Sequence, residues 1–414
     1  MMVYTYVGYF AAGLAVQVLV AKILKLCWIV LWRPYALIKS FEKQGIKGPS
    51  YSILHGTLPE MKTLLKAANE VILDTNCHDI AQRVQPHYNR WSAEYGEVFL
   101  FWRGVQPAIR IADPKLAKQI LSDKSGAYAQ PQFDHRLLSF AGNGVGQLNG
   151  PDWVRHRSIL TPAFTRDKLK LMTKRMAACT IDMIDDWKNR ARIADHQYVT
   201  IEMSEEFKKL TCDVITHTAF GSNYVEGGEV FKAQDELIHH CVATMADLYI
   251  PGSRFLPTPS NRQMWKMENN LNMVLLETLR LYCPVLETLR ETSRATKLGD
   301  FLIPKGVFIT IQLVQLHRSK EYWGEDANDF NPLRFKNGVS QAAKHPNAFL
   351  GFGMGPRTCL GQNFAMLEVK LVLSLLLQRF SFFLSPEYKH APANYLTMEA
   401  QYGVPTIVKP LLSK

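Results

Sequence analysis

The chain of 414 residues lacks the cysteine patterns that mark disulfide-rich and zinc-binding proteins. Its seven cysteines are odd in number and scattered, and no CxxC pair occurs among them. Low-complexity tracts are also missing, and 47% hydrophobic with 21% charged residues is the composition of an ordinary globular protein. We therefore expect a protein of a reducing compartment that is not held together by disulfides.

The sequence also lacks a basic helix or a patch in which basic and aromatic residues alternate, although its net charge is +11. The basic side chains are spread along the chain instead. An anionic membrane surface or an acidic protein partner is therefore favoured over nucleic acid, and we expect no nucleic-acid partner.

Charged residues are absent from the first 21 positions, MMVYTYVGYFAAGLAVQVLVA. As a helix this segment would be roughly 31 Å long, which is enough to cross the hydrocarbon core of a membrane. The positive charges that follow, beginning with Lys22, Lys25 and Arg33, favour a cytosolic position for everything after it. A cleaved secretory signal would carry its basic residues before the apolar run. We expect one N-terminal transmembrane helix that anchors the chain through residues 1–31.

Beyond the anchor the sequence predicts a mainly α domain with small β-sheets. Glycine and proline residues indicate a stiff hinge over residues 32–60. Two strands are expected within residues 96–114, followed by a mostly helical pattern up to about Met267. Strand-like sequence returns at Phe301–Val314 with a turn inside it, and Cys359–Phe380 reads as one long apolar helix.

The densest chemistry lies in FLGFGMGPRTCLGQNFA, residues 349–365. Its glycines do not form a phosphate loop, because Pro356 stands where GxGxxG needs glycine and no GK[ST] follows. Cys359 at a helix start could be a nucleophile, as in a cysteine hydrolase, although no histidine partner is fixed nearby in sequence. It could also be the thiolate ligand of a haem iron, which requires backbone N–H donors, an aromatic cover and glycines close to the porphyrin.

The pattern FxxGxRxCxG is complete in this loop, and it resembles the cysteine-loop signature of the cytochrome P-450 superfamily. FNPLRF at residues 330–335 is similar to the meander motif of that family, and WVRHR at residues 153–157 is similar to its WxxxR helix. The resemblance extends over nearly the whole chain, and it points to plant microsomal members of the clan that includes secologanin synthase and hormone hydroxylases. It implies the cytochrome P-450 fold.

The resemblance also implies a cofactor, haem b, with Cys359 as the axial ligand of the iron. It assigns Arg357 to the haem propionates, together with Trp153 and Arg157, which lie four positions apart on one helix face. The full set of cofactor-binding residues that it implies is Trp153, Arg157, Arg290, Phe352, Gly355, Arg357 and Gly361.

The tetrapeptide ETLR occurs twice, at Glu277–Arg280 and Glu287–Arg290. The first copy ends an apolar helical run that Pro284 stops, so its glutamate and arginine lie on one helix face. The resemblance makes this copy the ExxR motif, which forms a buried structural network with the meander arginine, Arg334. The second copy is expected to be a strand beside the haem, with Arg290 as a propionate partner. Alternatively, Arg290 is a solvated side chain on an edge strand.

One motif of the family, AGx[DE]T[TS], is missing. In the family it supplies the acid and alcohol that relay protons during oxygen activation. AGNGVG at residues 141–146 has only its first two letters and lies in the wrong order along the chain. The segments that would flank the missing helix meet near Asn270. The sequence therefore predicts an internally truncated fold in which no catalytic acid and alcohol pair is identified.

The leading hypothesis is a haem-thiolate monooxygenase that hydroxylates a lipophilic small molecule, with electrons from NADPH through a reductase. It would be a single-pass protein of the endoplasmic reticulum membrane with a cytosolic domain over residues 61–414, interrupted near 270. The alternatives are a truncated, non-catalytic family member that binds haem without turnover (a splice form, a decayed gene or a gene-model error), and a haem protein without oxygen chemistry.

Overall fold

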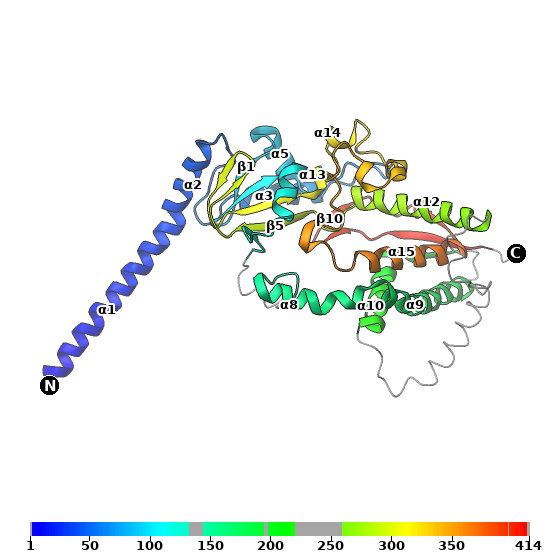
Figure 1. The fold of residues 1–414 in the computed structure, drawn as a ribbon, viewed down its shortest axis with the longest axis horizontal. Coiled ribbons are helices and arrows are strands. Elements are labelled where there is room, and N and C mark those ends of the chain that lie inside the picture. Colours follow the sequence, from blue (N-terminus) through cyan, green and yellow to red (C-terminus); the bar gives the residue numbers. More distant parts are fainter. Residues whose placement is uncertain (1, 132–143, 194–197, 220–258, 396, 412–414) are drawn as a thin grey trace. The chain divides into compact units, whose positions relative to one another are not determined.

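A computed structural model describes residues 2–131, 144–193, 198–219, 259–395 and 397–411 (Figure 1). The contacts between residues divide the chain into two compact units. The first unit contains residues 1–70, 81–142 and 286–316, and the second contains residues 71–80, 143–285 and 317–414.

The first unit begins with a long helical segment that is mostly exposed to its surroundings. α1 (Met2–Cys27) continues through a π-helical turn at Trp28–Trp32 into α2 (Arg33–Glu42). Within it, Ala12–Glu42 is long and apolar enough to cross a membrane, with a mean hydropathy of 2.2 and 6% of its most apolar window buried. Among the described residues this is the one such helix, and it lies near the N-terminus as the sequence predicts, but its range extends past residue 31, where the predicted anchor ends.

A five-stranded sheet forms the centre of the first unit. Its order is β1-β2-β8-β5-β3, with β2 and β8 parallel and the other neighbours antiparallel. The two strands expected within residues 96–114 pair as a hairpin, and Gly104 occupies the left-handed region with φ 65° in the turn. The strands are β1 (Phe99–Arg103), β2 (Gln106–Ile111), β3 (Tyr128–Ala129), β5 (Glu287–Thr292) and β8 (Phe308–Gln312).

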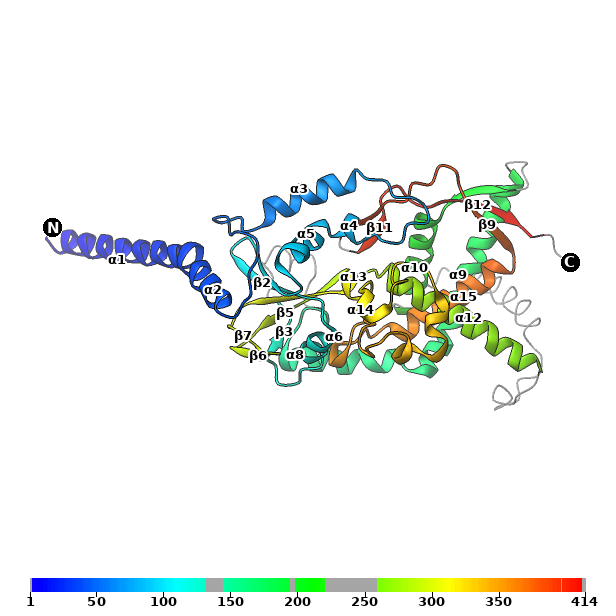
Figure 2. The same cartoon turned by 90° about the horizontal axis from the view of Figure 1, so that it is seen from above.

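Helices and a small hairpin surround this sheet. Tyr88 and Trp91 of α5 pack on Phe99 and Phe101 of β1 in one aromatic cluster, and α3 lies beside α5 (Figure 2). The elements are α3 (Leu58–Asn69), α4 (Ala81–Val84), α5 (Pro86–Tyr95), α6 (Pro114–Leu121), the hairpin of β6 (Thr296–Leu298) with β7 (Phe301–Ile303), and α13 (Leu313–Leu316).

The second unit is built on two long helices and a three-stranded sheet. α15 packs along α9, and α10 packs on α9 as well. Trp187 of α9 is fully buried in this core, and its indole N–H donates to Glu206 at 3.0 Å. The elements are α9 (Arg166–Ile193), α10 (Met203–Ala219), α15 (Gln362–Leu377), and the sheet of β4 (Val199–Glu202), β12 (Pro405–Pro410) and β9 (Phe380–Leu384).

The expected helix over Cys359–Phe380 is wrong at both ends. α15 begins only at Gln362, because the residues before it form an irregular loop, and Phe380 already belongs to β9, which pairs with β12. The sequence pattern did not show the boundary at Phe380, because the end of the helix and the start of the strand are both apolar.

The remaining elements of the second unit carry the predicted motifs. α12 runs without interruption from Pro259 to Leu281, through Asn270, and ends with the first ETLR copy. The others are α8 (Gly150–Leu160), α14 (Lys320–Trp323), the hairpin of β10 (Pro392–Asn394) with β11 (Met398–Ala400), and short 3₁₀ turns at Thr161–Phe164, Pro332–Asn337, Val339–Gln341 and Gly355–Arg357.

Candidate functional site

The first ETLR copy forms a completely buried ion pair at the end of α12. Nε and Nη2 of Arg280 donate to the two carboxylate oxygens of Glu277 at 2.7 and 2.8 Å, and both side chains are 0% exposed. Nε of Arg334 donates to the same carboxylate at 3.3 Å, as does the backbone N–H of Asn331 at 2.8 Å. The three residues of the predicted network therefore lie together.

Arg280 also binds the backbone of the segment that follows β8 and α13. Its Nη1 donates to the carbonyls of His317 and Ala327 at 2.7 and 2.6 Å, and its Nη2 donates to that of Asp329 at 3.1 Å. The guanidinium lies over the ring of Trp323 at 5.0 Å from its centroid. A buried guanidinium is stable only when its donors are paired in this way. Arg280 therefore fixes the course of residues 317–329.

His317 connects this network to the start of the cysteine loop. Its Nε2 accepts the backbone N–H of Leu350 at 2.9 Å, and its ring stacks on Phe349 with centroids 5.5 Å apart. Burial lowers the pKa of His317 to about 3, and the cations of Arg318 and Arg280 act in the same direction. The ring is therefore neutral at physiological pH. Because Nε2 is the acceptor, the proton of the ring lies on Nδ1.

Sequence reasoning missed His317, because its partner is a backbone amide 33 residues away that leaves no trace in the sequence. It also missed Asp326, which pairs with Arg334 at 2.6 Å. That pair spans only eight residues, and the acidic GEDAND stretch before FNPLRF could have indicated it.

The cysteine loop turns back sharply before α15. The backbone N–H of Cys359 donates to the carbonyl of Phe352 at 2.8 Å, and this bond closes the loop. Gly353 and Gly355 adopt φ of 75° and 72°, conformations that favour glycine over any other residue. Cys359 is exposed and precedes the first turn of α15. A thiolate at this position would face the free backbone N–H groups of a helix start.

Arg357 joins the cysteine loop to α8. It donates to the carbonyl of Leu148 at 2.6 Å and to Oδ1 of Asn149 at 3.1 Å, and its guanidinium lies 4.7 Å from the ring centroid of Trp153. Burial lowers the pKa of Arg357. Arg157 lies one turn further along α8 and is half-buried. Arg357 and Trp153 are thus in contact, and the predicted pair of Trp153 and Arg157 lies on α8, while the role of these residues toward a haem stays a prediction.

Comparisons with known proteins agree with these motifs. The family model "Cytochrome P450" matches residues 75–271 and 259–400. Cytochrome P450 709B3 of Arabidopsis thaliana is 38% identical to this chain, over 95% of the chain and 96% of that protein. The chain belongs to the cytochrome P450 family. Secologanin synthase 1 of Catharanthus roseus is 30% identical, over 95% of this chain and 97% of its own length.

The fold of this P450 is also that of solved members of the family. The structure of retinoic acid bound cyanobacterial CYP120A1 superposes with a TM-score of 0.61 and covers 82% of this chain and 98% of that one, at 17% identity. The mainly α fold with small sheets is thereby confirmed. Membership also makes the chain one of a family of monooxygenases that use haem with a cysteine thiolate ligand.

The residues around the cysteine loop of this P450 fit such a group. Cys359 is an exposed residue with a free thiol, and Phe164 lies near Gly361, at 3.8 Å from the position that a Cβ would take. The hydrogen bonds of the Arg357 guanidinium go to a carbonyl and to an amide, and among the described residues no carboxylate pairs with it. A ligand that carries both a metal and carboxylates would satisfy the sulfur atom and this cation together.

Arg290 lies in the other unit from the cysteine loop, so its predicted place beside the haem stays a prediction. The alternative of a solvated side chain on an edge strand is wrong. Arg290 is 6% exposed, and β5 lies between β8 and β3 inside the sheet. Its Nη1 donates to Oε1 of Gln130 at 2.8 Å and to the carbonyl of Leu289 at 2.7 Å.

Proposed function

We propose that this P450 inserts one oxygen atom from O2 into a lipophilic small molecule, with electrons from NADPH delivered by a reductase. The observation that carries the proposal is the connection from the buried Glu277–Arg280 pair, through His317, to the loop of Cys359. This connection holds the candidate ligand on a fixed backbone. The haem would supply the redox-active iron on which monooxygenation depends.

The side chains of the second unit would take defined roles in this function. Cys359 would bind the iron through its sulfur, and Phe352 would cover that sulfur from water. Gly355 and Gly361 would allow the porphyrin to approach the backbone. Arg357, Arg157 and the indole N–H of Trp153 would bind the haem propionates by charge and by hydrogen bonding. Arg290, which belongs to the first unit, is a further proposed propionate partner.

The anchor supports a membrane location for the reaction. A lipophilic substrate concentrates in the bilayer, and the positive charges of Lys22, Lys25 and Arg33 follow the apolar run. We therefore place the protein in the endoplasmic reticulum membrane as a single-pass protein with its domain in the cytosol. The net charge of +11 suits the acidic docking surface of a reductase.

The missing AGx[DE]T[TS] motif supports a second candidate, a truncated member that binds haem without turnover. The two family matches overlap at residues 259–271, and the alignment with cytochrome P450 709B3 runs over 500 residues although the chain has 414. Both facts agree with an internal deletion near Asn270. In this candidate the network of Glu277, Arg280 and Arg334 still supports the cysteine loop.

Isotopic oxygen separates the two candidates. The full chain, reconstituted in membranes with a plant NADPH–P450 reductase and a mixture of lipophilic plant metabolites, is incubated under ¹⁸O₂. Monooxygenation predicts products that are heavier by a single ¹⁸O atom and that require NADPH. Bound haem and NADPH oxidation without any labelled product would contradict turnover and would support the non-catalytic member.

A further inference from the structure

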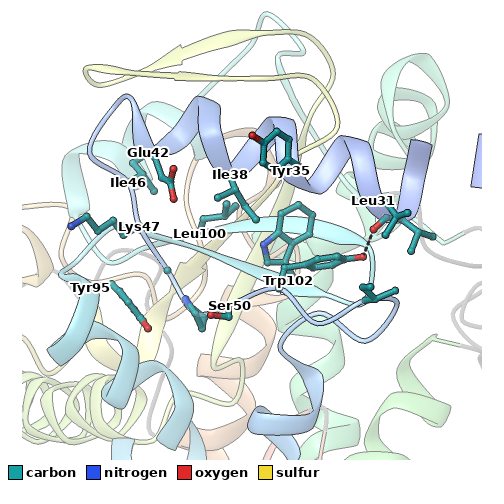
Figure 3. A pocket seen from close by; sticks show the side chains of 15 residues that line it. Leu31, Tyr35, Ile38, Glu42, Ile46, Lys47, Ser50, Tyr95, Leu100 and Trp102 are labelled. Carbon is teal, nitrogen blue, oxygen red and sulfur yellow. Dashed lines mark hydrogen bonds between the residues drawn. The ribbon is translucent and has the colours of Figure 1, made fainter. Parts of the chain in front are cut away.

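A cavity of about 490 Å³ lies in the first unit, beneath the end of the anchor helix (Figure 3). This volume is within the range of small-molecule sites. The cavity is bounded by the end of the π-helical turn, by α2, by the connector after α2 and by β1. It is lined entirely by residues of the first unit, and none of its lining belongs to the cysteine loop.

The lining of the cavity changes character from one end to the other. Figure 3 shows Leu31 at the end nearest the anchor, Ile38, Leu100 and Trp102 in the middle, and charged side chains at the far end. Those charges are the carboxylate of Glu42 and the ammonium of Lys47.

Specific hydrogen bonds fix the segments that form the walls of the cavity. The hydroxyl of Tyr51 donates to the carbonyl of Val30 at 3.0 Å, and the Tyr51 ring packs 4.8 Å from that of Trp102. The amide group of Gln44 exchanges two hydrogen bonds with the backbone of Leu302, at 3.1 and 2.7 Å. Within α2 itself, Nη2 of Arg33 donates to the carbonyl of Gly306 at 3.0 Å, so the helix is fixed against the rest of the first unit and the cavity is part of the fold.

The apolar end of the cavity continues directly into the membrane segment. Leu31 belongs to the π-helical turn at Trp28–Trp32, and Trp28 and Trp32 are 52% and 64% exposed, as expected of an aromatic belt at the membrane interface. Single π-helical turns within α-helices are frequent at functional sites. Because Leu31 adjoins the membrane segment, a lipid beside the anchor would reach the apolar end of the cavity first.

The polar end offers one cation and one anion. Lys47 has no carboxylate partner among the described residues, while Glu42 pairs with Lys39 at 3.1 Å on an exposed face, where such pairs are weak. A zwitterionic phospholipid head matches this arrangement, with its phosphate near Lys47 and its ammonium near Glu42. In this arrangement the head group points away from the anchor and the acyl chains point toward it, as they do for a lipid in the cytosolic leaflet.

We propose that this cavity binds one zwitterionic phospholipid of the bilayer, with an acyl chain along Leu31, Ile38 and Leu100 and the head group between Glu42 and Lys47. The bound lipid fixes the first unit on the membrane surface. The proposal depends on the anchor and on the cavity, and it holds whether or not the chain turns over a substrate.

Photolabelling tests the proposal on the full chain in phosphatidylcholine nanodiscs. A fraction of the lipid carries a diazirine on one acyl chain, and labelled peptides are mapped by mass spectrometry after irradiation. Leu100 and Trp102 are the β1 residues that line the cavity, and they are 5% and 0% exposed, so a β1 label mapped to either of them requires a chain inside the cavity. The proposal predicts label on β1 in addition to α1, and label on α1 alone would overturn it.

Two pairs of variants separate the cavity from a general effect of the membrane. Ile38→Trp fills the apolar middle and should abolish the β1 label, whereas Ala36→Trp adds the same bulk to α2 outside the cavity and should preserve it. Lys47→Gln should weaken the β1 label, and Lys43→Gln, at an exposed position outside the lining, should not. Equal labelling of β1 in Ile38→Trp and Ala36→Trp would contradict the assigned site.

Discussion

Nε2 of His317 accepts the backbone N–H of Leu350 at 2.9 Å, which joins the ETLR network to the cysteine loop. His317→Leu removes the acceptor and leaves a buried N–H unpaired, at a cost of about 1–3 kcal/mol. We expect lower haem retention and a CO-bound Soret band shifted away from the thiolate position.

His317→Gln is the matched variant, because its side-chain oxygen can accept the same N–H. It should recover both the haem content and the band position that His317→Leu loses. The two variants are compared by reduced CO difference spectra and by haem-to-protein ratio. Identical spectra in both variants would show that the Leu350 bond does not position the loop.

Removing one partner of the buried ion pair should be far more damaging than removing a surface partner. Glu277→Leu strands the Arg280 charge in a fully buried site, and we expect a loss of about 3–5 kcal/mol in the free energy of unfolding. Glu325→Leu, which breaks an exposed pair with Lys320, should cost far less, because solvent screens such pairs. Guanidinium unfolding curves give both values, and comparable losses would contradict the structural role of the network.

The stability of the fold should depend on pH through His317. The pKa of His317 is lowered from 6.5 to about 3 in the folded chain, so between these values the unfolded state binds the extra proton. The free energy of unfolding therefore rises with pH across this window, by up to about 1.4 kcal/mol per pH unit. This contribution of His317 is lost as the pH falls toward about 3.

Denaturant unfolding between pH 5 and 7 measures this slope. His317→Gln should reduce it, whereas the same change at His55, which is exposed, should leave it unaltered. An unchanged slope in His317→Gln would show that another group causes the pH dependence.

Arg357 should contribute more to haem retention than an exposed arginine of α8 does. Arg357→Leu removes the cation that lies over Trp153 and its hydrogen bonds to Leu148 and Asn149, so the purified chain should lose haem. Arg155→Leu serves as the control, since Arg155 is an exposed cation of α8. The haem-to-protein ratio after gel filtration measures the effect, and equal retention in both variants would argue against a propionate role.

The sequence predicted the parts of the site that depend on short spacings. Glu277 and Arg280 lie three residues apart on a helix that Pro284 ends, and local geometry alone places them on one face. The pattern of the cysteine loop is equally local. Arg334 entered only through the family resemblance, because its contact with Glu277 spans 57 residues.

Pairing between distant segments could not be predicted from the pattern. The sequence around Phe301–Val314 indicates two strands about a turn, yet β7 pairs with β6 while β8 lies between β2 and β5. Strand propensity describes a residue's fit to a pleated surface and does not name its neighbour. The cavity beneath α2 was missed for the same reason, since Ile38 and Trp102 come to line one cavity only after the connector folds back.

The reduced, CO-bound difference spectrum of the full chain tests the central claim most directly. The account predicts a strongly red-shifted Soret band that is lost in Cys359→Ser and kept in Cys212→Ser, a variant of another exposed cysteine. A spectrum without the shifted band, or one that Cys359→Ser leaves intact, would contradict Cys359 as the haem ligand.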